Sequence, residues 1–421
     1  MTSATERGYA KELDRRDPLA SFRQRFIVDD PDLIYLDGNS LGRLPKATAA
    51  RLKQLVEQEW GQQLIRGWNQ GWMETPERVG GKIAQLIGAQ ADEVVVADST
   101  SVNLFKLAVA ALQAQPDRHK IVTDDLNFPS DHHVLQGIQA LLDRPVEIHV
   151  ARSPDGIHGP LDELDDAIDR HTALVTLSHV AYKTSYAYDL QTMTERAQHQ
   201  GAFMLWDLSH SVGSLPVRLN DCAVPLAVGC TYKHLNGGPG APAFLYVRRD
   251  LQLRLANPIP GWMGKRNVFD FDPTYQPDQG IRRFLTGTPS ILSLCAIEPA
   301  IELFLEAGME RVREKSVLQT EYLIELWRAW LAPLGFSLNS PLESASRGAH
   351  VSLGHPHGLS IDQALIQEMK VIPDFRPPDT LRFGACPLYT SFEDIFEGMS
   401  RLRTTVIEKR FEKYTQAPLV T

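Results

Sequence analysis

Short apolar runs alternate with amphipathic segments through the middle of the chain. The apolar runs predict strands at residues 93–96, 120–123, 146–150, 173–177, 202–206 and 226–230. Helical periodicity predicts helices between them, at residues 101–115, 130–142 and 190–200. Strands that alternate with helices indicate an α/β fold, with a mostly parallel sheet of about seven strands covered on both faces.

The pattern is different at the two ends of the chain. Residues 1–30 are highly charged, with a helical pattern around residues 6–16, and we expect an arm that packs on the body or on a partner subunit. After residue 290 a long helical stretch with a break near Gly308 leads into short mixed elements, which predict a smaller α+β domain. We therefore expect an N-terminal segment packing with the small domain, a large domain and a small C-terminal domain, with boundaries at 1–47, 48–295 and 296–421.

Composition and charge narrow the class of protein. The 421 residues are 43% hydrophobic and carry a net charge of −9 with no long basic run, which argues against binding to nucleic acid or to an anionic membrane. The first residues lack the apolar core of a signal peptide, and no apolar run approaches the ~20 residues that span a bilayer, so we expect a cytoplasmic protein. Four widely spaced cysteines predict neither disulfides nor a structural metal.

Lys233 is the first candidate for chemistry. It follows the apolar run 226–230 and stands beside Tyr232, where the strand opens into the loop sequence NGGPGAP. Burying an unpaired ammonium is costly, so a lysine at this place suits a nucleophile that holds a carbonyl cofactor as a Schiff base. A lone surface lysine at a strand end is the commoner alternative.

Asp207 favours the interpretation of Lys233 as a cofactor-binding lysine over its interpretation as a surface lysine. It closes a strongly apolar predicted strand, and a buried carboxylate needs a cationic partner. The pyridinium nitrogen of pyridoxal 5'-phosphate is such a partner, and His210 lies three residues further on. A zinc site at Asp207 and His210 lacks further ligands at metal spacing.

Other side chains follow the predicted strands at the same edge of the sheet, where ligands bind in such folds. Thr100 and Ser101 stand at a strand-to-helix junction, which favours a phosphate but is also an ordinary helix cap. Phe128 is placed to stack on a flat cofactor and Asp131 lies one turn into the next helix, although a core aromatic ring and a helix-start aspartate are the simpler alternatives.

Several motifs together resemble one family. YLDGNSLG, NFPSD, SHVAYKT, WDLSHS, TYKHLNGGPGAPAFLYV, RRFLTGTPSILSL and LRFGACPLY are similar, in order from about residue 34 to 390, to the motifs of the kynureninases. These are fold-type I pyridoxal phosphate enzymes, with an aspartate aminotransferase-like large domain. The resemblance implies hydrolysis of L-kynurenine to anthranilate and L-alanine in the kynurenine pathway of tryptophan catabolism, linked to NAD biosynthesis. It also implies a homodimer whose active sites form at the subunit interface.

The resemblance also implies residue roles. Lys233 would hold the cofactor, Asp207 would pair with its ring nitrogen and Tyr232 would contact the cofactor. Because Tyr232 is adjacent to Lys233, we also expect it to donate a proton. The remaining cofactor contacts would come from Thr100, Ser101, Phe128, Pro129, Ser130, Asp131, Ser178, His210, Trp262 and Thr288, the last from the other subunit. Arg382 would bind the substrate α-carboxylate, near Asn39 and Ser40 of the turn in YLDGNSLG.

A few sequence positions determine the expected substrate preference and the choice between alternative activities. Family members that favour 3-hydroxykynurenine carry histidine and asparagine where this chain has Trp68 and Thr288, so we expect a preference for L-kynurenine. Three residues depart from the family pattern, namely Lys265 for histidine, Ser185 for glycine and His133 for an aromatic residue. A cysteine desulfurase-like lyase and a non-catalytic cofactor-binding protein are the alternatives, and no reactive cysteine precedes Arg382 to favour the first.

Overall fold

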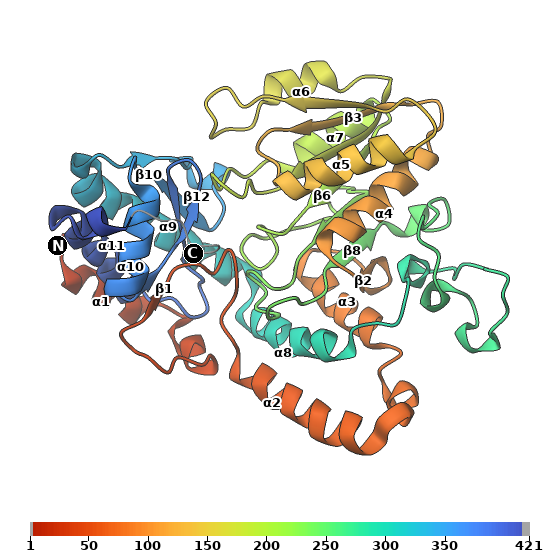
Figure 1. Cartoon of the computed structure of the whole chain (residues 1–421), viewed down its shortest axis with the longest axis horizontal. Helices are drawn as coiled ribbons and strands as arrows, with labels where there is room; N and C mark the ends of the chain where they lie inside the picture. Colours follow the sequence, from red (N-terminus) through yellow and green to blue (C-terminus); the bar gives the residue numbers. More distant parts are fainter. Residues whose placement is uncertain (1–2, 415–421) are drawn as a thin grey trace.

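A seven-stranded sheet lies at the centre of the larger of two lobes in the computed structural model, which describes residues 3–414 (Figure 1). The strand order is β2-β8-β7-β6-β5-β3-β4. The strands are β2 (Val94–Val96), β3 (Lys120–Asp124), β4 (Glu147–Ala151), β5 (Thr172–Ser178), β6 (Phe203–Asp207), β7 (Leu226–Gly229) and β8 (Phe244–Val247). Only β8 runs antiparallel to its neighbours. The predicted strands are therefore confirmed to within about two residues at each end.

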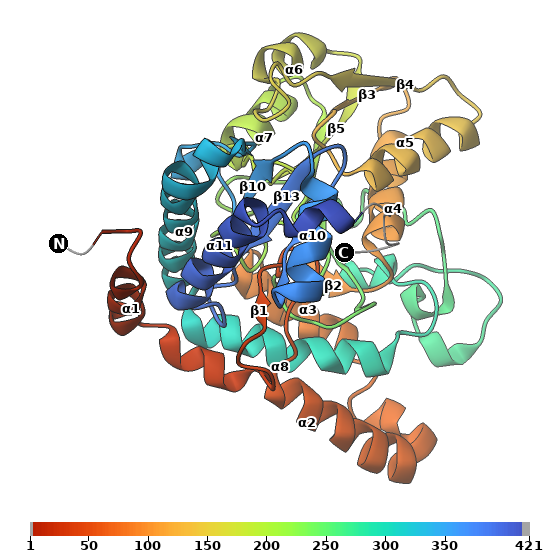
Figure 2. The same ribbon diagram turned by 60° about the vertical axis from the view of Figure 1, so that its left-hand side comes forward.

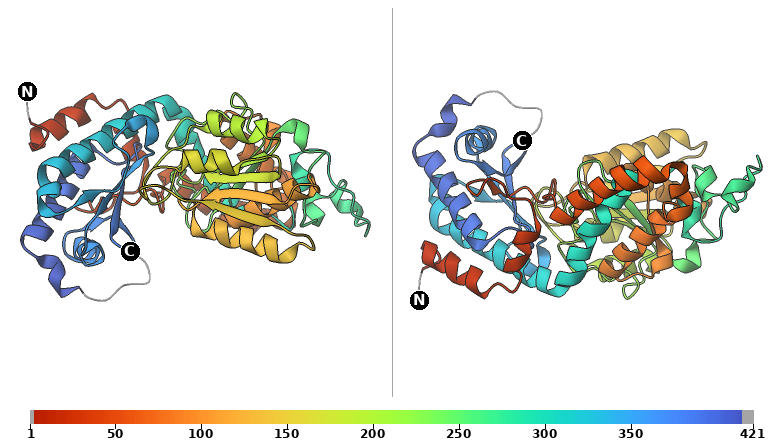
Figure 3. Two further views of the ribbon diagram at one scale, coloured as in Figure 1. Left: turned by 90° about the horizontal axis from the view of Figure 1, so that it is seen from above. Right: turned by 90° about the horizontal axis from the view of Figure 1, so that it is seen from below.

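Helices cover both faces of this sheet (Figure 3). The helices of the large lobe are α3 (Thr75–Leu86), α4 (Thr100–Gln113), α5 (Pro129–Leu141), α6 (Leu161–Ala167) and α7 (Leu190–His199). In the left view of Figure 3, α6 and α7 lie on one face and α5 on the other. Every residue of β5 and β6 is buried, as expected for strands covered on both sides.

The smaller lobe contains a four-stranded antiparallel sheet in the order β12-β13-β10-β9. Its strands are β9 (Ser337–Leu338), β10 (His350–Gly354), β12 (Asp374–Arg376) and β13 (Thr380–Gly384). The helices α9 (Met309–Leu326), α10 (Gly358–Glu368) and α11 (Phe392–Ile407) pack around it. A two-stranded parallel pair, β1 (Ile34–Tyr35) with β11 (Val371–Ile372), joins the N-terminal segment to this lobe.

The N-terminal arm docks on the small lobe. Helix α1 (Arg7–Arg16) packs against α11 (Figure 2). The Asp14 carboxylate accepts hydrogen bonds from the backbone N–H groups of Phe392 and Glu393, at 2.7 and 2.9 Å, and so caps α11. Asp17 forms a buried ion pair of 2.6 Å with Lys315 on α9. Both contacts hold the arm by its acidic side chains.

Two helices lie in the chain segments that connect the small lobe with the large lobe. Helix α2 (Lys46–Gln54) continues as a π-helical segment, Leu55–Gln63, and a 3-10 segment, Leu64–Gln70, although the sequence has helical periodicity from Lys46 to Leu64. Trp60 and Ile65 of this stretch are exposed while Leu55 and Gly67 are buried, so only part of the stretch packs against the body. Helix α8 (Ile291–Ala307) lies against α2 and α3 and spans the predicted domain boundary at residue 295. The three domain ranges remain predictions, and residues 1–2 and 415–421 of the outer two domains lie outside the described part.

Within residues 3–414, no helix combines the length and the apolarity that crossing a bilayer requires.

Candidate active site

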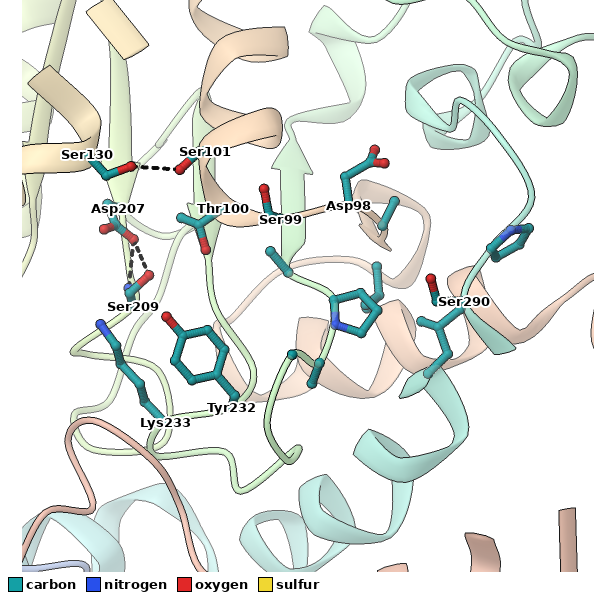
Figure 4. Close-up of a pocket in the computed structure, with 18 of the residues that line it drawn as sticks. Asp98, Ser99, Thr100, Ser101, Ser130, Asp207, Ser209, Tyr232, Lys233 and Ser290 are labelled. Carbon is teal, nitrogen blue, oxygen red and sulfur yellow. Dashed lines mark hydrogen bonds between the residues drawn. The ribbon is translucent and has the colours of Figure 1, made fainter. Parts of the chain in front are cut away.

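One cavity of about 500 Å³ lies at the carboxyl ends of β5, β6 and β7 (Figure 4). It brings together most of the residues selected from the sequence. The predicted residues that line it are Thr100, Ser101, Phe128, Ser130, Asp131, Ser178, Asp207, His210, Tyr232, Lys233 and Thr288. They come from segments spread over almost 190 residues of the chain, and the parallel sheet gathers them because its strand ends meet at one edge.

Lys233 lies half-buried in the loop that follows β7. Its Nζ is 2.9 Å from Nε2 of His210 and 5.7 Å from the centroid of the Phe128 ring. Burial, reinforced by the charge of Lys233, holds the pKa of His210 well below its usual range. His210 is therefore neutral near pH 7, and a ring nitrogen of it can accept a hydrogen bond from Lys233.

Asp207 is the last residue of β6 and is 6% exposed. Its Oδ1 accepts hydrogen bonds from the backbone N–H of Ser209 at 2.8 Å and from the Ser209 hydroxyl at 2.6 Å (Figure 4). No cationic side chain of the described residues lies within ion-pair distance of it. Burial raises the pKa of Asp207, although the Ser209 hydrogen bonds and the charge of Lys233 oppose this. A cationic ring nitrogen would supply the missing partner.

A second carboxyl group stands close to Asp207. Asp131 lies in the first turn of α5, is buried, and its Oδ2 has no hydrogen-bond partner. Burial, and then the charge of Asp207, raise the pKa of Asp131 well above its usual value. Asp131 therefore holds its proton more tightly than an exposed aspartate does.

Hydroxyl groups surround the N-terminus of α4 at another side of the cavity. Ser99 caps the helix by accepting a hydrogen bond from the backbone N–H of Val102, and Thr100 and Ser101 form its first turn. The Oγ atoms of Ser101 and Ser130 are 2.8 Å apart (Figure 4). Free helix N–H groups next to several hydroxyls suit a phosphate group.

Arg382 lies on β13, buried next to the cavity and outside its lining. Its guanidinium donates to the backbone oxygen of Tyr182 at 2.6 Å and to Oγ of Ser40 at 2.9 Å, and it pairs with Asp374. Its Nε has no partner. Asn39 lies beside Gly384 at the end of the same strand, and both polar side-chain atoms of Asn39 are unpaired. Arg382, Ser40 and Asn39 are thus grouped where the two lobes meet.

Besides Arg382, Ser40 and Asn39, three further predicted residues do not line the cavity of their own chain. Pro129 is the first residue of α5 and only begins the helix that carries Ser130 and Asp131. Trp68 packs edge-on against Trp72, with ring centroids 5.7 Å apart. Trp262 is 39% exposed and stands 6.3 Å from the ring of Phe269.

Several further residues of the site were given no individual role from the sequence. Asp98, Ser99, Ser209 and the segment 240–243 also line the cavity. Ser209 had a signal, because an aspartate followed two residues later by a serine favours a turn closed by the aspartate side chain. Asp374 and His350 had none, since only tertiary packing places them beside Arg382 and His210.

The structure also explains one departure from the family pattern. Ser185 stands where glycine was expected, and its φ of +67° is in the left-handed region that glycine favours. Its hydroxyl accepts a hydrogen bond from the backbone N–H of His350 at 3.4 Å, and its carbonyl accepts one from Gly348 at 2.7 Å. Lys265 is buried near Trp262 with its Nζ 3.3 Å from the Arg266 carbonyl oxygen, while His133 lies on α5.

The chemistry of the donor set fits pyridoxal phosphate. The cavity offers a lysine amine, a buried carboxylate without a cationic partner, an exposed aromatic ring at Phe128 and a helix N-terminus with hydroxyls. In the described residues, no group of three or more His, Cys, Asp or Glu side chains is arranged to hold a metal ion. The set therefore matches an aldehyde cofactor with a cationic ring and a phosphate.

Comparison with known proteins identifies the family. Residues 34–334 match the aminotransferase class-V family, and residues 312–402 match the kynureninase C-terminal domain. A kynureninase of Burkholderia mallei (strain SAVP1) is 44% identical over 399 residues, covering 94% of each chain. A kynureninase of Pseudomonas fluorescens is 43% identical, covering 94% of this chain and 95% of its own. The chain belongs to the kynureninase family.

Membership in the kynureninase family confirms the expected enzyme class and cofactor, a pyridoxal phosphate-dependent hydrolase that acts on carbon–carbon bonds. Solved structures confirm the predicted fold class. A cysteine desulfurase from Thermococcus onnurineus NA1 superimposes with a TM-score of 0.78 at 18% identity, covering 94% of this chain and 98% of its own. A C-DES variant with glycine covalently linked to its PLP cofactor gives 0.78 at 18% identity, covering 89% and 97%. At these identities the likeness shows the fold alone.

Proposed function

We propose that this protein hydrolyses L-kynurenine to anthranilate and L-alanine, as part of tryptophan catabolism in the cytoplasm. The observation that carries the proposal is the single cavity that holds Lys233, Asp207 and the hydroxyl-rich start of α4 in a chain 44% identical to a kynureninase. The curated relatives are similar to this chain over nearly its whole length, so the likeness includes every segment that contributes to the cavity.

In the proposed reaction, pyridoxal phosphate supplies an electron-withdrawing ring next to the substrate α-carbon. Asp207 keeps the ring nitrogen protonated, and the first turn of α4 binds the phosphate. Nζ of Lys233 forms the link to the cofactor at rest and then accepts the proton of the substrate α-carbon. Its 2.9 Å contact with His210 supports this role, because a neutral histidine stabilises the protonated amine.

Tyr232 is the proposed proton donor in the later steps. Its ring is next to Lys233, with Nζ 5.9 Å from the ring centroid, and Figure 4 shows both side chains pointing in the same direction from their loop. Burial raises the pKa of Tyr232, so the hydroxyl keeps its proton at neutral pH and can donate it. Water adds to the side-chain ketone of the substrate, the bond between its β and γ carbons breaks to release anthranilate, and protonation of the remaining three-carbon fragment completes the release of alanine.

Arg382 is the proposed ligand of the substrate α-carboxylate. Its fork-shaped guanidinium suits two parallel hydrogen bonds to a carboxylate. The Ser40 hydroxyl and the buried Asn39 amide lie in the same group, and Asn39 has unused hydrogen-bonding atoms. These contacts support binding of the amino-acid end of the substrate at the small lobe.

We also propose a preference for L-kynurenine over 3-hydroxykynurenine. Thr288 lies at the edge of the cavity, and neither it nor Trp68 offers the histidine and asparagine groups that would meet an additional hydroxyl.

A homodimer with shared active sites completes the proposal. Exposed apolar side chains gather on two segments of the large lobe, the stretch 55–70 and the loop 256–280. They are Val56, Trp60, Leu64, Ile65, Ile259, Trp262, Phe269, Phe271 and Tyr275. Thr288 lines the cavity of its own chain, and a second copy on this surface would bring its own Trp68 or Trp262 to the edge of that cavity.

A desulfurase activity on the same fold is less well supported. Among residues 3–414, no cysteine lines the cavity. Cys386 follows Arg382, is buried, and its burial raises the pKa of its thiol to about 11. Such a thiol is a poor nucleophile at neutral pH.

The test is to load the purified protein with cofactor and supply L-kynurenine, 3-hydroxykynurenine and L-cysteine separately. We expect fluorescent anthranilate from L-kynurenine, slower turnover of the hydroxylated substrate and no sulfide from L-cysteine. Lys233→Ala is the inactive control, and Lys11→Ala changes an exposed lysine outside the cavity as its matched control. Normal turnover by Lys233→Ala, or sulfide release faster than anthranilate formation, would contradict the proposal.

A further inference from the structure

A buried ion pair stands at the beginning of α4, and the proposed chemistry uses neither of its members. Lys106 lies in the second turn of α4 with its side chain 0% exposed, and its Nζ pairs with Oδ2 of Asp98. The Asp98 side chain is 27% exposed and lines the cavity. Among residues 3–414, no second carboxylate lies within ion-pair distance of Lys106. The buried ammonium therefore depends on Asp98 for its counter-charge.

Asp98 is an unexpected residue at this end of the cavity. It stands two residues before Thr100, so the Cα atoms of the two residues are at most about 7.6 Å apart. Figure 4 shows Asp98, Ser99 and Thr100 in succession along the cavity. The first turn of α4 is the proposed phosphate site, and charges within about 10 Å of each other are incompletely screened by salt. A carboxylate without a counter-charge at this place would therefore weaken binding of a phosphate.

The structure holds the Asp98 carboxylate by both of its oxygens. Oδ2 pairs with Lys106, and Oδ1 accepts a hydrogen bond from the Thr286 hydroxyl at 3.3 Å. The backbone oxygen of Asp98 accepts another from the N–H of Ala243 at 2.9 Å. The φ of Asp98 is +51°, in the left-handed region that is uncommon for residues other than glycine. Contacts to three segments of the chain thus fix the carboxylate in one orientation.

Lys106 also holds the cavity wall formed by residues 285–290. Its Nζ donates to the backbone oxygen of Phe284 at 2.8 Å, directly before this wall, and is 3.5 Å from Oδ1 of Asn103. Together with Asp98, these acceptors occupy all three N–H donors of the ammonium. Burial lowers the pKa of Lys106, and the charge of Asp98 opposes this effect. The ammonium is therefore held entirely by elements that surround the phosphate end of the cavity.

We propose that Lys106 is a positioning residue for the phosphate end of the cavity. Its ammonium holds the Asp98 carboxylate between α4 and the wall 285–290 and neutralises it, so that an anion can bind at the first turn of α4. The role rests on the proposed function only in placing the cofactor phosphate at this turn.

The test compares the affinities of the cofactor-free protein for pyridoxal phosphate and for pyridoxal, which has the same ring and aldehyde but no phosphate. Binding of each is followed by absorbance, and the ratio of the two dissociation constants is the phosphate preference. In Lys106→Met, Asp98 keeps its charge and loses its counter-ion. We expect the affinity for pyridoxal phosphate to fall about tenfold, and that for pyridoxal to stay within about twofold. A general loss of structure would weaken both ligands equally and would overturn the inference.

A double variant tests whether the charge is responsible. Asp98→Asn with Lys106→Met removes both charges and keeps an acceptor for the Thr286 hydroxyl, so the phosphate preference should return to within about threefold of that of the unchanged protein. Lys120→Met is the matched control. Lys120 is also buried and pairs with Asp169 at 2.7 Å, but it begins β3 at the end of the sheet opposite the cavity, so both affinities should stay unchanged. A double variant as weak as Lys106→Met would overturn the inference.

Asp98→Asn alone does not depend on the folding of Lys106→Met. It removes the negative charge and keeps the lysine, so the phosphate preference should stay equal or rise. A fall of more than about twofold would contradict the role of the charge.

The combined variant Thr100→Val with Ser101→Ala distinguishes failure of the inference from failure of the proposed function. It removes the two hydroxyls of the first turn and should lower the phosphate preference. If the preference stays unchanged, the proposed phosphate placement is wrong and the role of Lys106 fails with it. If it falls while Lys106→Met has no effect, only the role of Lys106 is wrong.

Discussion

Asp374 forms an ion pair with Arg382 across two neighbouring strands, β12 and β13, where the two residues are directly opposite each other. Their side chains are 0% and 2% exposed. The hydroxyl of Ser40 donates to the same carboxylate and accepts from the same guanidinium. Three segments of the chain therefore fix the orientation of Arg382 before any substrate binds.

The first prediction concerns Arg382 and its carboxylate ligand. Arg382→Lys keeps the positive charge and loses the planar fork, so KM for L-kynurenine should rise about 10- to 100-fold, or about 1.4 to 2.8 kcal/mol of binding. Steady-state kinetics on the cofactor-loaded variant checks this. An unchanged KM would show that the substrate carboxylate binds elsewhere.

A second variant tests the structural support of Arg382 separately from substrate binding. Asp374→Asn leaves a buried guanidinium without its counter-charge and should destabilise the protein by about 3 to 5 kcal/mol. Arg376→Gln removes a 2.9 Å pair with the same carboxylate at a side chain that is 34% exposed, and should cost much less. Urea unfolding of both variants compares the two costs.

The second prediction concerns substrate preference. The double variant Trp68→His with Thr288→Asn supplies the polar groups that this chain lacks, so the ratio of kcat/KM for 3-hydroxykynurenine to that for L-kynurenine should rise at least about tenfold. Trp330→His, on a tryptophan packed against Phe396 in the small lobe, should leave the ratio unchanged. A double variant with the original ratio would remove these two positions from the explanation of specificity.

The third prediction tests shared active sites. If Trp262 serves the cavity of the partner subunit, mixing Lys233→Ala with Trp262→Ala creates heterodimers with one intact site. Random exchange then restores about one quarter of the unchanged activity. Lys233→Ala mixed with Arg382→Lys is the control, since both residues serve the cavity of their own chain and neither site of a heterodimer is complete. Activity that returns equally in both mixtures would contradict the shared arrangement.

The fourth prediction concerns stability and pH at Asp124, the last residue of β3. Its carboxyl accepts a hydrogen bond from Tyr188, and burial raises its pKa from the ordinary 3.8 to about 7. The folded protein then binds a proton that the unfolded chain has released between these pH values. The contribution of Asp124 to the free energy of unfolding is largest below pH 4. It declines by about 1.4 kcal/mol per pH unit until the pH passes about 7.

The matched variant for this group is Asp124→Asn. It keeps an acceptor for Tyr188 and cannot ionise, so its urea midpoint should vary less with pH between about 4 and 7 than that of the unchanged protein. At pH 8 it should be the more stable of the two. The same pH dependence in both proteins would mean that Asp124 does not titrate in this range.

The sequence alone was sufficient for the large sheet and for much of the cavity. Strands such as β5 and β6 are buried on both faces, so their composition is apolar throughout and easy to recognise. Lys233, Asp207 and Thr100 each follow such a strand, and they are expected to lie close together because parallel strands end at one edge of the sheet. The winding of residues 55–70 escaped prediction, because periodicity describes a packed helix face and this stretch has several exposed apolar side chains.

Apolar patterning by itself determined the fold class, the edge of the sheet that carries the site and the lysine at its centre, because burial in a parallel sheet leaves a periodic trace in the chain. Only the tertiary structure decided that Asp374 supports Arg382, that His350 reaches His210 from the other lobe, and that Trp68 and Trp262 do not line the cavity of their own chain. These relationships depend on how two lobes pack. Contacts between side chains distant in sequence leave no periodic pattern in a single chain.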